Sequence, residues 1–74
     1  MQKSADYMNG IRKAENLVNR ARSWRKRYGM KECLGYDKHN QLADYISTLN
    51  LTYQERCEIF DTFNTLCDNL NKEN

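Results

Sequence analysis

Apolar residues recur at spacings of four and three along two long stretches of this chain, and no proline interrupts either stretch. The first set is Tyr7, Ile11, Ala14, Val18 and Ala21. The second set is Tyr53, Cys57, Phe60, Phe63, Cys67 and Leu70. This spacing lines one side of an α-helix, whereas the two faces of a β-strand alternate at every residue. The pattern therefore predicts long amphipathic helices that bury their apolar stripes against one another.

Capping signals delimit these helices. Ser4 is a predicted N-cap before the first stretch, and Gly29 is the expected stop after it. Thr52 and Glu55 have the spacing of a capping box, in which each side chain satisfies an unpaired backbone amide of the other residue. The segment between the two long helices has one apolar face, made by Leu42, Tyr45, Ile46 and Leu49. The predicted helices cover about residues 5–28, 38–49 and 53–70, and the tail at 71–74 is expected to fray. The pattern of the connecting segment 30–38 is less clear and allows at most a single helical turn.

The length of 74 residues allows one domain, 1–74, with one modest core. We therefore predict an all-α fold, a small three-helix bundle with a long basic first helix. A chain of this size buries only about 60% of its unfolded surface, so a deep enzyme pocket is not expected.

Groups capable of catalysis or metal binding are sparse. Cys33, Cys57 and Cys67 show no paired spacing, and the single histidine, His39, lies in a polar stretch. Glu55 is better explained as a cap than as a catalytic acid. We expect free thiols, no metal, no cofactor and no enzymatic activity.

Charge is distributed unevenly along the chain. Residues 1–31 contain nine Lys or Arg and two acids, a net charge of +7, whereas residues 32–74 contain three and eight, a net charge of −5. This asymmetry suits an anionic partner, and it equally suits attraction between helices of one molecule.

The basic charge is densest in NRARSWRKRYG, residues 19–29, where five cations surround a single tryptophan. The apolar stripe is interrupted there, because the residue at the next position of the stripe after Ala21 is Arg25. The last turn and a half of the helix therefore need not pack in the bundle. The candidate partner-binding residues are Lys13, Arg20, Arg22, Trp24, Arg25, Lys26, Arg27 and Tyr28.

Four interpretations of these residues remain open. Tryptophan and arginine are enriched at protein-interface hot spots, and the same side chains could grip phosphates while the indole stacks on a base. Alternatively Trp24 caps the core and the cations form a solvated face that pairs with acids of the second half, Asp44, Glu55, Glu58, Asp61 and Asp68. A homo-oligomer would instead cover apolar surface at Met8, Leu17, Tyr28 or Tyr36.

Two segments carry resemblances. Residues 19–29 resemble the arginine-rich RNA-binding helices of phage antitermination peptides. LADYISTLNLTYQERCEIF, residues 42–60, resembles segments in proteins of bacteriophages and mobile elements of low-GC Gram-positive bacteria, including tail tape-measure proteins. These resemblances imply a small accessory phage protein that binds and regulates or inhibits a host nucleic-acid-handling complex, as an anti-CRISPR-like inhibitor or a transcription regulator does. Its partner would be a host protein or nucleoprotein complex, with direct DNA or RNA binding as the alternative.

No apolar run approaches the roughly 20 residues of a membrane span, and MQKSADYMNG lacks the apolar stretch of a signal peptide. We therefore expect no membrane partner and a location in the cytoplasm of a bacterial host cell.

Overall fold

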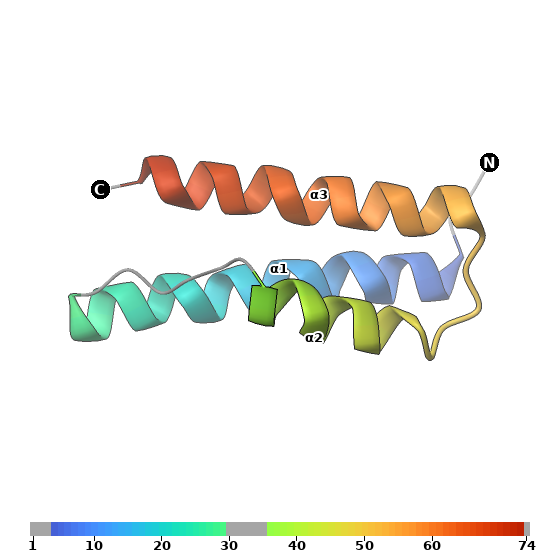
Figure 1. The fold of residues 1–74 in the computed structure, drawn as a ribbon, viewed down its shortest axis with the longest axis horizontal. Helices are drawn as coiled ribbons and strands as arrows, with labels where there is room; N and C mark the ends of the chain where they lie inside the picture. The colour runs from blue at the N-terminus through green and yellow to red at the C-terminus, as the bar shows by residue number, and fades with distance from the viewer. Residues whose placement is uncertain (1–3, 30–35, 74) are drawn as a thin grey trace.

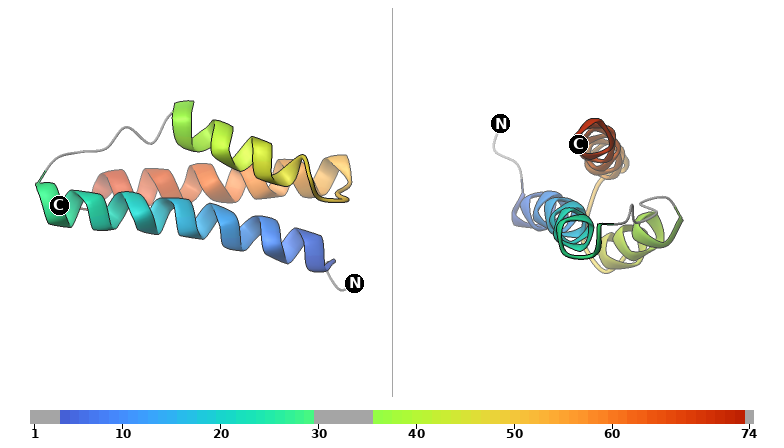
Figure 2. Two further views of the ribbon diagram at one scale, coloured as in Figure 1. Left: turned by 90° about the horizontal axis from the view of Figure 1, so that it is seen from below. Right: turned by 90° about the vertical axis from the view of Figure 1, so that its left-hand side faces the viewer.

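The computed structural model describes residues 4–29 and 36–73, and within them it contains three α-helices and no strand. They are α1, Ala5–Tyr28; α2, Tyr36–Ile46; and α3, Tyr53–Lys72. α1 and α3 run in the same direction, and α2, which lies between them in the sequence, runs in the opposite direction (Figure 1). Seen end on, the three helices stand at the corners of a triangle (Figure 2). The predicted all-α bundle with a long first helix is confirmed.

The ends of the long helices follow the capping signals. The Ser4 hydroxyl accepts a hydrogen bond from the Tyr7 amide at 3.1 Å. Gly29 adopts the left-handed conformation with φ 65°, and its amide donates to the Arg25 carbonyl at 2.9 Å. At the start of α3 the Glu55 amide donates to Thr52 Oγ1 at 3.1 Å, and the Thr52 amide donates to Glu55 Oε1 at 3.0 Å. The capping box is confirmed.

Three predicted boundaries, both ends of the second helix and the end of the third, were wrong. The second helix covers 36–46 rather than 38–49. The Ser47 and Thr48 hydroxyls donate to the carbonyls of Asp44 and Tyr45, both at 2.7 Å, so the chain turns there instead of continuing the helix. The third helix continues to Lys72, and the tail predicted to fray is attached to α1 by the contacts described below.

The core lies where the three apolar stripes meet. Its buried members are Ala14, Leu17, Val18 and Ala21 of α1, Leu42 and Ile46 of α2, and Ile59, Phe63 and Leu70 of α3. Leu17 is fully buried, so its proposed place on an oligomer surface was wrong. Tyr53, expected in the apolar stripe of α3, stands in the first turn of that helix and is 84% exposed.

Gly10 lies where α1 packs tightly against the Ile59 side chain of α3. A β-carbon at this position would overlap the Cδ1 methyl of Ile59, and it would lie 3.3 Å from Cγ1 of the same side chain. The sequence pattern gave no reason to single out this glycine. Its missing side chain is what lets Ile59 fill the space between the helices.

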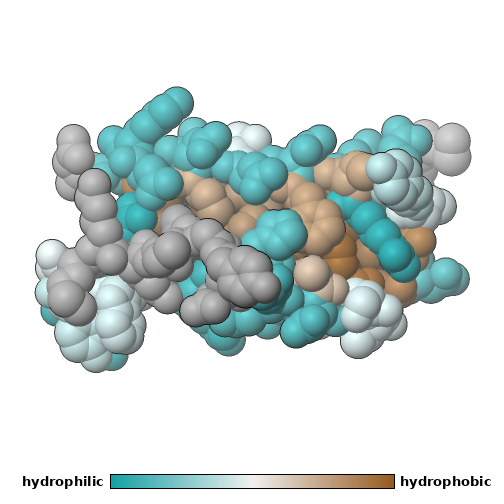
Figure 3. Space-filling model, in the orientation of Figure 1, coloured by the Kyte–Doolittle hydropathy of each residue, from teal (hydrophilic) through white to brown (hydrophobic). Residues whose placement is uncertain are grey.

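α2 is half as long as its neighbours, so it accompanies only the N-terminal half of α1 (Figure 1). The backbone of α1 lies close to both other helices, whereas α2 and α3 are further apart and meet through side chains such as His39 and Phe60. Figure 3 shows an apolar band in the space between α2 and α3, bordered by hydrophilic side chains. Within residues 4–29 and 36–73, none of the helices has the length and hydropathy that a membrane crossing requires.

Candidate partner-binding site

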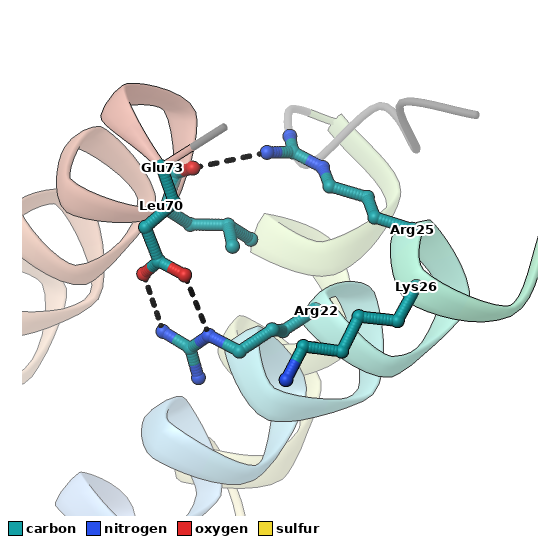
Figure 4. Close-up of a pocket in the computed structure, with 5 residues that line it drawn as sticks. All are labelled: Arg22, Arg25, Lys26, Leu70 and Glu73. Atoms are coloured by element: carbon teal, nitrogen blue, oxygen red, sulfur yellow. Dashed lines mark hydrogen bonds and ion pairs between the residues drawn. The ribbon is translucent and has the colours of Figure 1, made fainter. Parts of the chain in front are cut away.

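The basic end of α1 has two faces with different surroundings. One face, which we call the aromatic face, lines a shallow hollow and consists of Arg20, Ser23, Trp24, Arg27 and Tyr28. The other, which we call the clasp, lines a second hollow against the end of α3 and consists of Arg22, Arg25, Lys26, Leu70 and Glu73 (Figure 4). The eight predicted binding residues are therefore not one surface.

The aromatic face is built by helical spacing alone. Arg20, Trp24, Arg27 and Tyr28 stand at i, i+4, i+7 and i+8, which places them on one side of α1. The rings of Trp24 and Tyr28 lie 4.4 Å apart between centroids, tilted by 48°, and the two residues are 42% and 52% exposed. Two large aromatic side chains are thus held against each other at the surface.

The two arginines of the aromatic face are not neutralised by the described part of the chain. Neither Arg20 nor Arg27 forms an ion pair or side-chain hydrogen bond within residues 4–29 and 36–73. No acid occurs between Asn16 and Gly29, so the neighbouring turns of their own helix offer no carboxylate either. Cations in a last helical turn are also favoured by the helix dipole, by about 0.3–1 kcal/mol each.

The clasp joins the ends of the two parallel helices. Arg22 donates from Nε to Glu73 Oε1 at 3.1 Å and from Nη2 to Glu73 Oε2 at 3.0 Å, a side-on fork (Figure 4). Its third nitrogen donates to Asn19 Oδ1. The hydrogen bond from Arg22 is the largest cause that lowers the pKa of the Glu73 carboxyl, and the charges of Lys26 and Arg25 lower it further.

Arg25 closes the end of α3. Its Nη1 donates to the Leu70 carbonyl at 3.1 Å and its Nη2 donates to Asn71 Oδ1 at 2.7 Å. The Leu70 carbonyl belongs to the last turn of α3 and also accepts a hydrogen bond from the Glu73 amide at 3.1 Å, so Arg25 is its second donor. The sequence left open whether the last turn and a half of α1 packs in the bundle, and the Arg25 guanidinium does bind the end of α3.

Lys13 lies apart from both faces. Its ammonium stands 5.4 Å from the centroid of the Tyr45 ring of α2, in a cation–π contact. It is separated from Trp24 by three turns of α1. Lys13 thus helps to attach α2 rather than extending the aromatic face.

The acid that forms an ion pair with the basic end of α1 was not predicted from the sequence. Glu73, in the tail expected to fray, pairs with Arg22 at 3.0 Å. Glu55, expected to pair with these cations, completes the capping box and accepts a hydrogen bond from the Ser4 hydroxyl. Because α1 and α3 are parallel, their C-terminal ends lie side by side. Had the direction of α3 been known, Glu73 could have been predicted as the partner of Arg22.

The remaining reactive groups are dispersed. Cys57 and Cys67 are free thiols, and partial burial raises the pKa of the Cys67 thiol. His39 stacks on Phe60 with 4.8 Å between ring centroids. Within the described ranges, no three His, Cys, Asp or Glu residues come together as a metal site. Cys33 lies outside the described residues.

No protein-family model, curated protein or solved structure matches this chain.

Proposed function

We propose that this chain is a non-catalytic binding protein whose aromatic face docks on a partner protein. The observation that carries the proposal is the exposed Trp24–Tyr28 pair between two arginines that lack partners in the described chain. Trp, Tyr and Arg are the residue types most enriched at interface hot spots. The matching surface on the partner would be an apolar pocket with an acidic rim.

A protein partner fits this face better than nucleic acid does. Of the five cations in the basic segment, Arg22 and Arg25 are bound by α3 and Lys26 lines the clasp, which leaves Arg20 and Arg27 on the aromatic face. Two phosphate contacts would give a logarithmic salt slope of only about −2 on duplex DNA, too few for strong non-specific binding. The Trp24 ring also contacts the Tyr28 ring, so part of the indole surface is already covered and cannot stack on a base.

We propose further that the protein is encoded by a bacteriophage or mobile element, and that it binds a host nucleic-acid-handling complex in the bacterial cytoplasm and inhibits or redirects it. The resemblances of residues 19–29 and 42–60 support the origin. The small size of the chain and its exposed aromatic face support action by binding.

The test is capture of partners from a bacterial lysate by the tagged protein, before and after nuclease treatment, with Trp24→Ala beside the wild type. We expect a nuclease-resistant protein complex, and at least about 2 kcal/mol, roughly thirtyfold, weaker binding by Trp24→Ala. Helicity and thermal stability should stay unchanged, because Trp24 lies outside the buried core.

Tyr53→Ala is the matched control, since Tyr53 is an exposed aromatic residue at the other end of the bundle. It should bind like the wild type. Equal losses from the two variants, or capture that disappears with nuclease, would refute docking through the aromatic face, and the second result would point to direct nucleic-acid binding.

A further inference from the structure

The clasp holds more positive charge than its one carboxylate balances. Arg22, Arg25 and Lys26 line the hollow at the end of α3, and Glu73 is the only acid among the described residues that line it (Figure 4). Lys26 forms no ion pair within the described chain, and Nε of Arg25 is buried without a hydrogen-bond partner there. Donors and charge thus remain after Glu73 has been bound.

The contact with Glu73 has the geometry of anion recognition. Arg22 presents two N–H groups side by side, at 3.1 and 3.0 Å from the two carboxylate oxygens. A guanidinium binds a free carboxylate or a phosphate through the same planar fork. The apolar side chain of Leu70 also lines the hollow.

Glu73 itself is held weakly. It follows the last helical residue of α3, and its side chain is 49% exposed, while that of Arg22 is 32% exposed. Ion pairs with this degree of exposure contribute little, because water screens the charges and both side chains lose freedom. An external oxyanion would therefore have to overcome only a small preference for the internal carboxylate.

We propose that Arg22, Arg25 and Lys26 form an oxyanion-binding site that Glu73 fills from within the chain until a phosphate or carboxylate ligand replaces it. This site faces α3 and is separate from the aromatic face, so it does not depend on the proposed function.

The test is a titration of the whole protein with inorganic phosphate, and separately with acetate, at constant ionic strength, followed by NMR. Glu73→Gln removes the internal competitor, and we expect it to bind phosphate about fivefold more tightly than the wild type, the factor that a weak exposed pair implies. The tighter-bound of the two probes identifies whether the site prefers phosphate or carboxylate.

Two further variants separate a built site from general attraction to a basic helix. Arg22→Lys in the Glu73→Gln background keeps the charge and removes the fork, so phosphate binding should weaken at least about fivefold. Arg12→Gln in the same background removes an exposed cation at a distance from the clasp and should change little. Equal losses from the two variants would overturn the proposal.

A direct reading comes from the wild type, where no substitution can disturb the fold. As phosphate binds, the side-chain carboxyl carbon signal of Glu73 should move toward that of a free glutamate. A Glu73 signal that stays fixed at saturating phosphate, or equal phosphate affinities for the wild type and Glu73→Gln, would show that Glu73 is a structural partner of Arg22 only.

Discussion

The two ends of α1 meet α3 in different ways. Near the N-terminus the contact is steric, because Gly10 lets the buried Ile59 side chain approach the helix. Near the C-terminus half-exposed polar contacts, made by Arg22 and Arg25, are added to the buried apolar Leu70. The comparison indicates that the packed end determines the stability of the bundle, whereas the clasped end can exchange partners at low cost.

The largest expected effect is at the packed end. Alanine is favoured over glycine within a helix by about 1 kcal/mol, yet Gly10→Ala should destabilise the protein by about 1–3 kcal/mol because the new methyl overlaps Ile59. Urea denaturation measures the change. Asn9→Ala, at an exposed neighbouring position, is the matched control and should be neutral or stabilising.

A double mutant sharpens this result. Ile59→Val removes the Cδ1 methyl that Gly10→Ala would overlap, so the double variant should be more stable than Gly10→Ala alone. If Gly10→Ala stabilises the protein as much as Asn9→Ala does, the close approach at Gly10 does not exist in solution.

A smaller effect is expected at the clasped end. Arg25→Met keeps an apolar stem but loses the hydrogen bonds to the Leu70 carbonyl and to Asn71, so we expect a loss of about 1 kcal/mol. Hydrogen exchange should accelerate in the last turn of α3. Arg27→Met, two residues further on, should stay within about 0.5 kcal/mol, and equal effects of the two substitutions would remove the distinction between clasp and aromatic face.

The smallest effect is the pH dependence of the clasp. The pKa of Glu73 is lowered in the folded protein by the hydrogen bond from Arg22, so the folded state favours the charged carboxylate. This contribution is complete above the usual pKa of a glutamate and is lost as the pH falls through the lowered value. The difference in Tm between the wild type and Glu73→Gln should therefore shrink from about pH 7 to about pH 3. If the difference in Tm stays the same over this pH range, the substitution acts through packing and not through the charge of Glu73.

The sequence was sufficient where the physics is local. The start at Ser4, the stop at Gly29 and the capping box of Thr52 and Glu55 depend on groups within about four residues of one another, and all were predicted. The apolar spacing likewise identified most of the core. The end of α2 was missed because the Ser47 and Thr48 hydroxyls bind backbone carbonyls, an alternative that short polar side chains always offer.

Tertiary structure decided what the cations do. Arg20, Arg22, Arg25 and Arg27 look alike in sequence, and only the parallel placement of α1 and α3 separates those that reach Glu73 and Leu70 from those left beside Trp24. It also decided the role of Gly10, which is set by Ile59. Caps and periodicity are fixed by neighbours along the chain, whereas an ion pair or a close approach between residues some 50 positions apart depends on the direction and rotation of whole helices.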